Sequence, residues 1–361
     1  MKSWEKHVKL FIPGPVEVYP DVRAEMARPM IGHRSSAFQD LYADTIAKLK
    51  KVLFTQNDAF LSTSSATGVW EACARNCIEK KALACVNGAF SGSWHKVALA
   101  NGKDADKIEV PMGKAIKPEM IDEKLATGEY DSLLFVHNET STGVANPLYE
   151  VAEVMKKYPD VLFMVDAVSS MTGMKIEVDK LGIDVCLASV QKAFALPPGL
   201  AVFTVSKKAY ERAEKIKNRG YYFDFLVFKK YAEKNQTPST PAIPQIYGLN
   251  MQLDKMLHEG MEARFERHKH MADFTRKWAL DRGFELFAEK GYESNTLTTV
   301  NNNKGIVVAD LIKKLEQKGM TISNGYKDLK EKNFRIAHMG DMKIADIKEL
   351  LETIDEILRG G

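Results

Sequence analysis

Short apolar runs alternate with amphipathic stretches between residues 59 and 205 of this 361-residue chain. Apolar runs bounded by Gly, Asn, Asp or Ser predict strands at 82–86, 132–136, 161–165, 185–190 and 200–205. Helical periodicity predicts helices at 37–54, 67–80, 91–101, 117–127 and 147–158. Strands that are almost wholly apolar and separated by helices indicate a largely parallel sheet that is buried on both faces.

A different pattern follows this alternation. Helical periodicity runs from about 240 to 282, with Pro241 and Pro244 near its start, and predicts one long helix. Beyond it the pattern predicts strands and helices of a small α+β domain, the strands around 284–287, 296–300 and 333–338 and the helices at 309–319 and 343–359. We therefore expect an N-terminal arm (1–20), a large domain (21–245), and the long helix with a small domain (246–361).

Composition narrows the class of protein. The chain is 45% hydrophobic and 27% charged, as in ordinary globular proteins, and its net charge of +3 is too small to indicate a nucleic-acid partner. No segment approaches the roughly 18 apolar residues of a membrane span, and the N-terminus lacks a signal-peptide core. The four cysteines form no CxxC pair and show no metal-ligand spacing, so we expect reduced thiols, no metal site and a cytoplasmic location.

Polar residues follow several of the predicted strands. Asp166 follows the strand at 161–165, the segment His-Asn-Glu-Thr-Ser-Thr-Gly follows 132–136, and Gln191 and Lys192 follow 185–190. Ligands of open α/β sheets bind beyond the carboxyl ends of the strands. The hydroxyl-rich turn at 60–68 opens a helix, whose N-terminus is suited to hold a phosphate.

Each of these features has an ordinary structural explanation. Asp166 could cap a helix, the hydroxyl-rich turn could be only a turn, and the Lys192 amine could extend to the surface. Together they supply a phosphate cradle, a carboxylate, a hydroxyl and a lysine at one sheet edge. Pyridoxal 5′-phosphate requires this set, because the lysine forms a Schiff base with its aldehyde and the carboxylate keeps its ring nitrogen protonated.

The chain resembles the class V, fold-type I pyridoxal-phosphate aminotransferases, and within them the alanine–glyoxylate and serine–pyruvate branch. The motifs that carry the resemblance are, in order, FIPGPVEV, GHRS, SSATG, VNGAF, ETSTGV, VDAVSS, SVQKAFALPPGLA, TPSTPAIPQIYGL and NFRIAHMG. The resemblance implies a fold like that of aspartate aminotransferase. This fold has a large cofactor-binding domain around a mostly parallel, seven-stranded sheet, and a smaller C-terminal α+β domain.

The resemblance also implies roles for the matching residues. Lys192 corresponds to the Schiff-base lysine that shuttles the proton, Asp166 to the partner of the pyridine nitrogen, and Arg335 to the arginine that binds the substrate α-carboxylate. The further cofactor contacts that it implies are Phe90 as the stacking ring, Thr140 or, with a one-residue slip, Ser141 near the ring oxygen, and Ser65, Ala66, Thr67 and Gln191 at the phosphate. The resemblance also implies that Gly14, in FIPGPVEV, is one of the substrate-binding residues.

Thr240 and Thr237 correspond to residues that reach the phosphate of the neighbouring subunit, which implies a homodimer with shared active sites. Two departures from the family pattern stand out. An arginine that often follows the Asn-Gly motif is missing from "FSGS" before Trp94, and alanine replaces a frequent glycine in the phosphate loop.

The resemblance implies ping-pong transamination from serine or alanine to glyoxylate or pyruvate. Phosphoserine aminotransferase, which uses 2-oxoglutarate, is the alternative, because His33 and Arg34 could bind a substrate phosphate across the dimer. Asp328 and Leu329 occupy the place of a second His-Arg pair found in many bacterial phosphoserine enzymes, which counts against that alternative.

The motifs exclude one other activity of the same class and leave others open. Cysteine desulfurase is excluded, because it needs a late nucleophilic cysteine and no cysteine follows Cys186. The motifs alone do not separate a transaminase from lyases such as kynureninase. A non-catalytic cofactor-binding protein, or an assembly subunit that kept the fold, is the rival from a different functional class.

Overall fold

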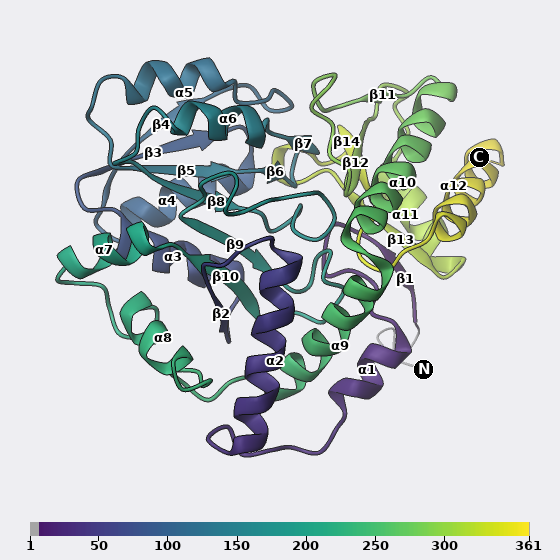
Figure 1. Cartoon of the computed structure of the whole chain (residues 1–361). Helices are drawn as coiled ribbons and strands as arrows, with labels where there is room; N and C mark the ends of the chain where they lie inside the picture. The colour runs from purple at the N-terminus through teal and green to yellow at the C-terminus, as the bar shows by residue number, and fades with distance from the viewer. Residues whose placement is uncertain (1–6, 361) are drawn as a thin grey trace.

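The larger of two main sheets forms the centre of the computed structural model, which describes residues 7–360 (Figure 1). Its seven strands lie in the order β2 (Asp58–Ser62), β10 (Ala201–Val205), β9 (Val185–Ser189), β8 (Leu162–Asp166), β5 (Ser132–Val136), β3 (Lys81–Val86) and β4 (Asp104–Glu109). β10 runs antiparallel to both of its neighbours, and the remaining pairs are parallel. The predicted mostly parallel, seven-stranded sheet is therefore confirmed.

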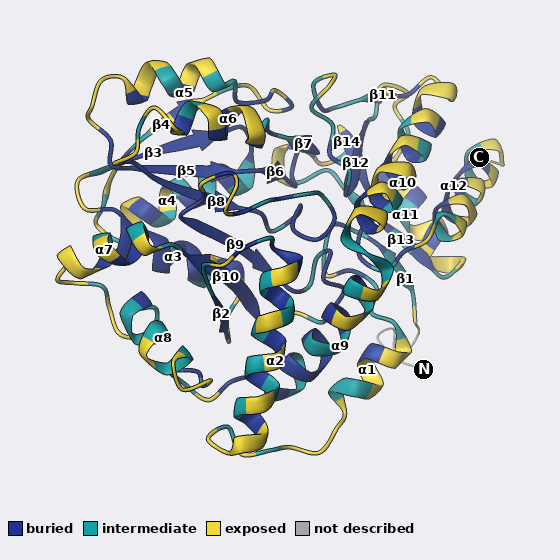
Figure 2. Cartoon of the chain, in the orientation of Figure 1, coloured by how far each residue is buried: buried dark blue, intermediate teal, exposed yellow. Residues whose placement is uncertain are grey.

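Helices cover both faces of this sheet and make three layers. One face packs against α1 (Pro20–Met26), α2 (Ser36–Val52), α5 (Pro118–Leu125), α6 (Leu148–Met155) and α9 (Ile243–Glu259). The other face packs against α3 (Ala66–Cys77), α4 (Ala89–Ala100), α7 (Lys207–Lys215) and α8 (Phe225–Ala232). Successive strand residues point to opposite faces, so Leu133 and Phe135 enter one core and Leu134 and Val136 the other. Figure 2 shows the strands buried between helices whose outer sides are exposed.

The smaller sheet lies to one side of the first. Its five strands are ordered β1 (Lys9–Phe11), β13 (Met320–Asn324), β14 (Asn333–Ala337), β12 (Leu297–Asn301) and β11 (Glu285–Leu286). The helices that pack on it are α10 (Met261–Asp281), α11 (Val308–Gln317) and α12 (Ile344–Arg359), and they share its hydrophobic core. A short hairpin of β6 (Asn138–Glu139) and β7 (Val144–Ala145) follows β5 in the chain, between two strands of the large sheet.

The N-terminal segment contributes to the small domain. β1 pairs in parallel with β13, so part of the predicted N-terminal arm belongs to the smaller sheet. Residues 1–6 of that arm lie outside the described residues. The predicted boundary between residues 245 and 246 falls inside α9, whose side chains Ile246, Leu249 and Leu253 pack in the large core.

Two expectations about single elements are wrong. The predicted long helix from about 240 to 282 is two helices, α9 and α10, which meet at Gly260 with φ +83° and ψ 129°. L-residues rarely adopt this backbone conformation, so the glycine lets the chain change direction. The turn predicted over 60–68 begins later than expected, because residues 60–62 complete strand β2.

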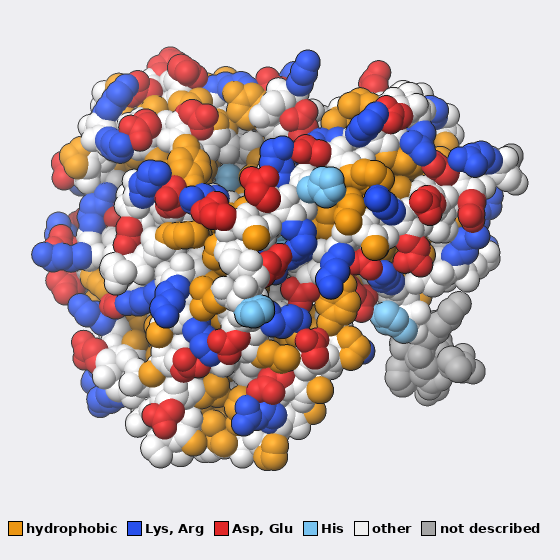
Figure 3. Space-filling model, turned by 45° about the vertical axis from the view of Figure 1, so that its right-hand side comes forward, with side chains coloured by type: hydrophobic (Ala, Val, Ile, Leu, Met, Phe, Trp, Pro, Cys, Tyr) orange, Lys and Arg blue, Asp and Glu red, His pale blue; other side chains and the backbone are white. Residues whose placement is uncertain are grey.

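The surface shows no concentration of one charge on the face seen in Figure 3, where acidic and basic side chains alternate. This agrees with the net charge of +3. Over residues 7–360, none of the helices is both long and apolar enough to cross a membrane.

We expect Gly260→Ala to destabilise the chain by about 1–2 kcal/mol, since nothing lies within 4 Å of an added Cβ and only the backbone conformation is unfavourable. Gly92→Ala, inside α4, is the matched control. Its Cβ would make an ordinary contact of 3.6 Å with Val86, and alanine favours a helix by about 0.5–1 kcal/mol over glycine. Urea unfolding of both variants measures the difference. Equal effects of the same sign would contradict the role of Gly260.

Candidate active site

Three neighbouring strands deliver the predicted residues to one edge of the large sheet. β5, β8 and β9 are adjacent and parallel, and their carboxyl ends lead into residues 137–143, Asp166 and Lys192. Parallel strands bring such ends together because they all leave the sheet on the same side. The site therefore forms where the topology concentrates polar groups.

Lys192 lies in the tight turn after β9, half-buried between the large domain and the N-terminal segment. Its Nζ donates a hydrogen bond to the carbonyl of Pro13. Gly14 packs against its side chain so closely that an added Cβ would lie 2.6 Å from Lys192 Cδ. Burial, with a smaller contribution from the positive charge of Arg335, lowers the pKa of Lys192 to about 8, while Asp166 opposes the shift.

Asp166 ends β8 and is only 3% exposed. Its Oδ1 accepts the Val168 N–H at 2.8 Å, and its Oδ2 accepts the indole N–H of Trp70 at 2.7 Å. Burial raises the pKa of Asp166 to about 7, although these two hydrogen bonds and Lys192 favour its ionised form. The carboxylate is thus held in a fixed orientation at the base of the site.

Trp70 is a site residue that the sequence did not reveal. It lies on α3 one turn after Ala66 and stacks on Trp94 with ring centroids 6.0 Å apart. Trp94 is 1% exposed. From the sequence alone Trp70 looks like an ordinary core residue of an amphipathic helix. Its position one turn from the predicted phosphate loop was the signal that could have identified it.

The predicted phosphate loop lies at the N-terminus of α3. Ser65 is the N-cap, its side chain makes no capping bond, and Ala66 and Thr67 are the first helical residues. The backbone N–H groups of a first helical turn and the helix dipole favour an anion. Because Trp70 on the same helix contacts Asp166, this end of α3 lies beside the predicted carboxylate.

The segment 237–242 lies against the same region. The Ala242 N–H donates to Thr63 Oγ1 at 3.1 Å. Thr240 is exposed, whereas Thr237 is buried and its hydroxyl donates to the Ser239 carbonyl at 2.8 Å. Of the two threonines, Thr240 has the more accessible hydroxyl for a contact with another subunit.

Thr140 and Ser141 point to different partners. Thr140 Oγ1 lies 2.5 Å from the hydroxyl of Ser169, three residues beyond Asp166. Ser141 Oγ instead donates to Glu139 at 2.6 Å and accepts the Ala89 N–H. Thr140 is therefore the better candidate for a hydroxyl close to a ring bound over Asp166.

Glu139 is a second residue that the sequence did not single out. It is fully buried, and its carboxylate accepts the Ser91 N–H at 2.9 Å and the Ser91 hydroxyl at 2.8 Å. It also accepts the Phe90 N–H at 3.3 Å. Glu139 thus fixes the first turn of α4, which carries the predicted stacking residue Phe90.

Arg335 comes from β14 of the small domain. Its guanidinium donates to the Asn324 carbonyl from Nε (3.2 Å) and Nη2 (3.1 Å), and to the Thr140 carbonyl from Nη1 (3.3 Å). It also lies over the ring of Tyr326, which is 5.2 Å from the ring of Phe90. Burial lowers the pKa of Arg335 to about 10. The structure thus joins Arg335, Thr140 and Phe90 across the two domains.

The remaining predicted residues lie around this centre. Gln191 Oε1 accepts the Ser189 hydroxyl at 2.5 Å. His33 is half-buried in the loop before α2, and the neighbouring Arg34 donates to the Thr237 carbonyl at 2.8 Å and stacks on Tyr231. These contacts tie Arg34 to the loop that carries the two threonines.

The chain resembles known proteins over almost its whole length. The family model described as "Aminotransferase class-V" matches residues 15–338. An uncharacterized aminotransferase of Methanocaldococcus jannaschii is 42% identical, covering 96% of this chain and 90% of its own. A serine–glyoxylate aminotransferase of Methylorubrum extorquens is 33% identical (92% and 86%), and a soluble hydrogenase 42 kDa subunit of Anabaena cylindrica is 32% identical (97% and 92%).

Solved structures show the same fold. An alanine–glyoxylate aminotransferase from Nostoc matches with a TM-score of 0.92 and 28% identity, over 98% of this chain and 95% of its own. A phosphoserine aminotransferase from Cytophaga hutchinsonii matches with a TM-score of 0.89 and 30% identity, over 99% of both chains. The expected aspartate-aminotransferase-like architecture is confirmed.

We expect Asp166→Asn to stabilise the cofactor-free chain more at pH 8 than at pH 4. The folded-state pKa of about 7 lies above the unfolded value of 3.8, so the folded state holds the proton more tightly and loses stability as pH rises between these values. A pKa that differs by one between the folded and unfolded states changes the free energy of unfolding by about 1.4 kcal/mol. Urea unfolding at both pH values measures the effect, and a pH-independent difference would contradict it.

Proposed function

Because the chain belongs to the class-V aminotransferases, we propose that it transfers the amino group of a small amino acid to glyoxylate or pyruvate, with pyridoxal 5′-phosphate as cofactor. The observation that carries this proposal is the convergence of a lysine, a buried carboxylate and a buried guanidinium. Lys192 follows β9, and Asp166 ends the adjacent strand β8. Arg335 donates to the Thr140 carbonyl, and the Thr140 hydroxyl contacts Ser169, three residues beyond Asp166.

The residues present fit this cofactor. The α3 N-terminus offers backbone N–H groups without a side-chain cap for the phosphate, and Asp166 offers carboxylate lone pairs for the ring nitrogen. The Thr140 hydroxyl contacts that of Ser169, three residues beyond Asp166, and Phe90 packs against Tyr326, so both are available to a ring bound at this site. A cationic ring nitrogen beside Asp166 would lower the pKa of this carboxyl and favour its ionised form.

The cofactor and the residues of the site have different roles in the proposed reaction. The cofactor, when bound, supplies an aldehyde that condenses with amines and a ring that delocalises the electrons left when the substrate α-carbon loses its proton. Lys192 would hold the cofactor through its Nζ. Once the substrate amine has replaced it, the free Nζ would take the proton from that α-carbon and pass it on to the cofactor. A pKa of about 8 suits this task, because an amine with its ordinary pKa near 10.5 would be almost fully protonated at neutral pH.

Arg335 orients the amino acid by its α-carboxylate. A guanidinium meets a carboxylate with two parallel hydrogen bonds, and a low-dielectric site strengthens them. The three carbonyl contacts of Arg335 fix the plane of its fork. The substrate α-carbon would then lie between Arg335 and the Lys192 amine.

The preference for glyoxylate is supported by relatives with this acceptor in their names, at 33% identity in sequence and a TM-score of 0.92 in structure. Serine or alanine is the donor we propose, since the site chemistry needs only a carboxylate clamp and a small side chain beside Tyr326 and Phe90.

Phosphoserine transamination is the second candidate, favoured by the structural match at 30% identity. The placement of the residues supports it less well. Arg34, proposed to bind a substrate phosphate, is already bonded to carbonyls of the 236–238 loop. At the place of the second cation pair, Leu329 is buried in the small domain and Asp328 carries the wrong charge.

A non-catalytic role is the remaining rival, since one relative is named as a hydrogenase subunit. Lys192, Asp166 and Arg335 are all present, and the charges of Asp166 and Arg335 both act on Lys192, which supports an enzyme. We further propose a homodimer in which Thr240, exposed on its loop, reaches the phosphate site of the second copy. The four free, buried cysteines are in keeping with the cytoplasmic location expected from the sequence.

Without added amine, Lys192→Ala should lack the visible absorbance that bound cofactor gives when its aldehyde is condensed with a lysine, and it should not turn over. Lys208→Ala, which removes a lysine of α7 whose amine is hydrogen-bonded to the carbonyls of Pro159 and Val161, is the control and should keep both. Absorbance spectra of the purified proteins without amine, and assays of turnover with serine, provide the measurement. If Lys192→Ala kept the band without added amine and still transaminated, the assignment would be refuted.

A comparison of turnover with different substrate pairs identifies the amino donor and the oxo-acid acceptor. We expect serine or alanine with glyoxylate to exceed phosphoserine with 2-oxoglutarate by at least tenfold in kcat/KM, about 1.4 kcal/mol in transition-state binding. Coupled assays of product formation give both values. A reversed preference would establish the phosphoserine reaction instead, and conversion of neither pair with cofactor bound would favour the non-catalytic rival.

A further inference from the structure

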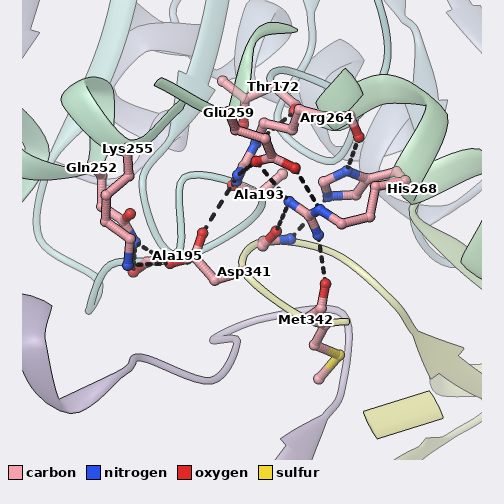
Figure 4. A network of polar contacts seen from close by, with 12 residues as sticks. Thr172, Ala193, Ala195, Gln252, Lys255, Glu259, Arg264, His268, Asp341 and Met342 are labelled. Carbon is pink, nitrogen blue, oxygen red and sulfur yellow. Dashed lines mark hydrogen bonds and ion pairs between the residues drawn. The ribbon is translucent and has the colours of Figure 1, made fainter. Parts of the chain in front are cut away.

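A network of polar side chains, most of them buried, contacts the backbone of the Lys192 turn at Ala193 and Ala195 (Figure 4). Its central residue is Arg264 of α10, whose side chain is 1% exposed. The guanidinium donates from Nη2 to the Ala193 carbonyl at 2.7 Å and from Nε to the Thr172 carbonyl at 3.1 Å. Its Nη1 contacts Glu259 at 3.0 Å and Asp341 at 3.4 Å.

A second side chain holds the other end of the same turn. Gln252 of α9 is fully buried, and its Nε2 donates to the Ala195 carbonyl at 2.9 Å. Ala195 has a φ of +56°, a backbone conformation that L-residues rarely adopt, so this turn needs support from its surroundings. Arg264 and Gln252 thus fix two carbonyls within three residues of Lys192.

Asp341 joins these two supports. Its Oδ2 accepts Gln252 Nε2 at 3.0 Å and Lys255 Nζ at 3.0 Å, and its Oδ1 faces Arg264. Burial alone would raise the pKa of Asp341, but Arg264 and Lys255 bring it below the ordinary value. One carboxylate therefore links α9, α10 and the two side chains that hold the Lys192 turn.

Asp341 belongs to the small domain. It follows β14, the strand that carries Arg335, by four residues. Its loop is held in place as well, since the Gly340 N–H donates to His268 Nε2 at 3.1 Å and Arg267 donates to the Gly340 carbonyl at 3.2 Å. The Lys192 turn and the strand of Arg335 are thus joined through a single buried network.

We infer that Asp341, with Gln252 and Arg264, is a positioning group that sets the Lys192 turn in register with the strand that carries Arg335. This inference rests on the proposed function, because it assigns to the network the spacing between the proton-transferring amine and the carboxylate-binding guanidinium. The three residues act through backbone carbonyls and do not touch the substrate.

Two variants test the inference. Asp341→Asn keeps the shape and removes the charge that Arg264 and Lys255 face. Gln252→Met removes the hydrogen bonds from Nε2 to Ala195 and Asp341, and the Gln252 Oε1 has no hydrogen-bond partner to lose among the described residues. Asp355→Asn is the matched control, because Asp355 is a largely buried carboxylate that accepts from Trp278 and Arg282 in the small domain, away from this network.

Hydrogen exchange of the cofactor-free protein measures directly how well the backbone amides of the Lys192 turn are protected. In the native chain the Ala195 N–H donates to the Lys192 carbonyl and the Leu196 N–H to the Val190 carbonyl. We expect amides of residues 192–196 to exchange on the order of tenfold faster in Asp341→Asn and Gln252→Met. Asp355→Asn should leave them unchanged. Equal exchange in all variants would overturn the inference.

The pKa of the Lys192 amine is a second measurement, and a general loss of stability would not change it. Acetic anhydride labelling of the cofactor-free protein, followed by mass spectrometry across pH, measures the pKa of the Lys192 amine. Arg335 and Asp166 are the charged groups that act on this amine, and burial is the main cause of its lowered pKa. Loosening the turn should hydrate the amine and raise its pKa in the two test variants but not in the control.

The outcomes separate this inference from the proposed function. Faster exchange with an unchanged Lys192 pKa would assign the network to stability alone and overturn its positioning role. Both measurements use the cofactor-free protein, so a failure of the native chain to take up pyridoxal phosphate would refute the proposed function without affecting them. If Asp341→Asn does not fold, Gln252→Met, which changes no charge, decides the question.

Discussion

The placement of three ionisable groups in one site, two of them buried and Lys192 half-buried, is the constraint on which the rest of the structure depends. The pKa of Lys192 and that of Arg335 are lowered, and the pKa of Asp166 is raised, each chiefly by burial. Every one of these shifts favours the uncharged form and therefore lowers the stability of the folded chain near neutral pH. A fold optimised for stability alone would not collect these groups, and such a cost is typical of functional sites.

The architecture maintains this arrangement by holding two domains at a fixed spacing. Lys192 and Asp166 come from the large sheet, and Arg335 comes from the small one. The chain changes direction at Gly260, so α9 packs in the large core while α10 packs in the small core. Polar contacts at Thr140 and at Asp341 then link the domains. Rigid elements with such supports give a site the precision that catalysis needs.

The sequence predicts the buried centre of the fold better than its edges. β5 is found at 132–136 as predicted, because all five of its residues are buried and apolar or small. The pattern does not reveal β4, since it lies at the sheet edge and only Ala105 and Ile108 of its six residues are apolar and buried. It also merges β2 with a turn, because the last residue of β2 opens a run of hydroxyls. One glycine, Gly260, is enough to divide a helix that periodicity alone predicts as continuous.

Within the site, the sequence reveals the residues that end strands and misses those that support them. Lys192 and Asp166 stand out as polar groups after apolar runs, a local signal. Glu139, Trp70 and Arg264 look like ordinary helix or loop residues, and their roles depend on contacts with segments 48, 96 and 71 positions away. Such contacts follow from tertiary packing, which no local pattern encodes. Burying a polar side chain lowers the stability of the fold unless the side chain is hydrogen-bonded. Each of these residues is therefore both packed in the interior and hydrogen-bonded to a distant segment. The supporting residues can consequently be found only from the structure. They are the side chains of distant segments that hydrogen-bond to backbone carbonyls or amides next to Lys192 or Phe90, or to the Asp166 side chain.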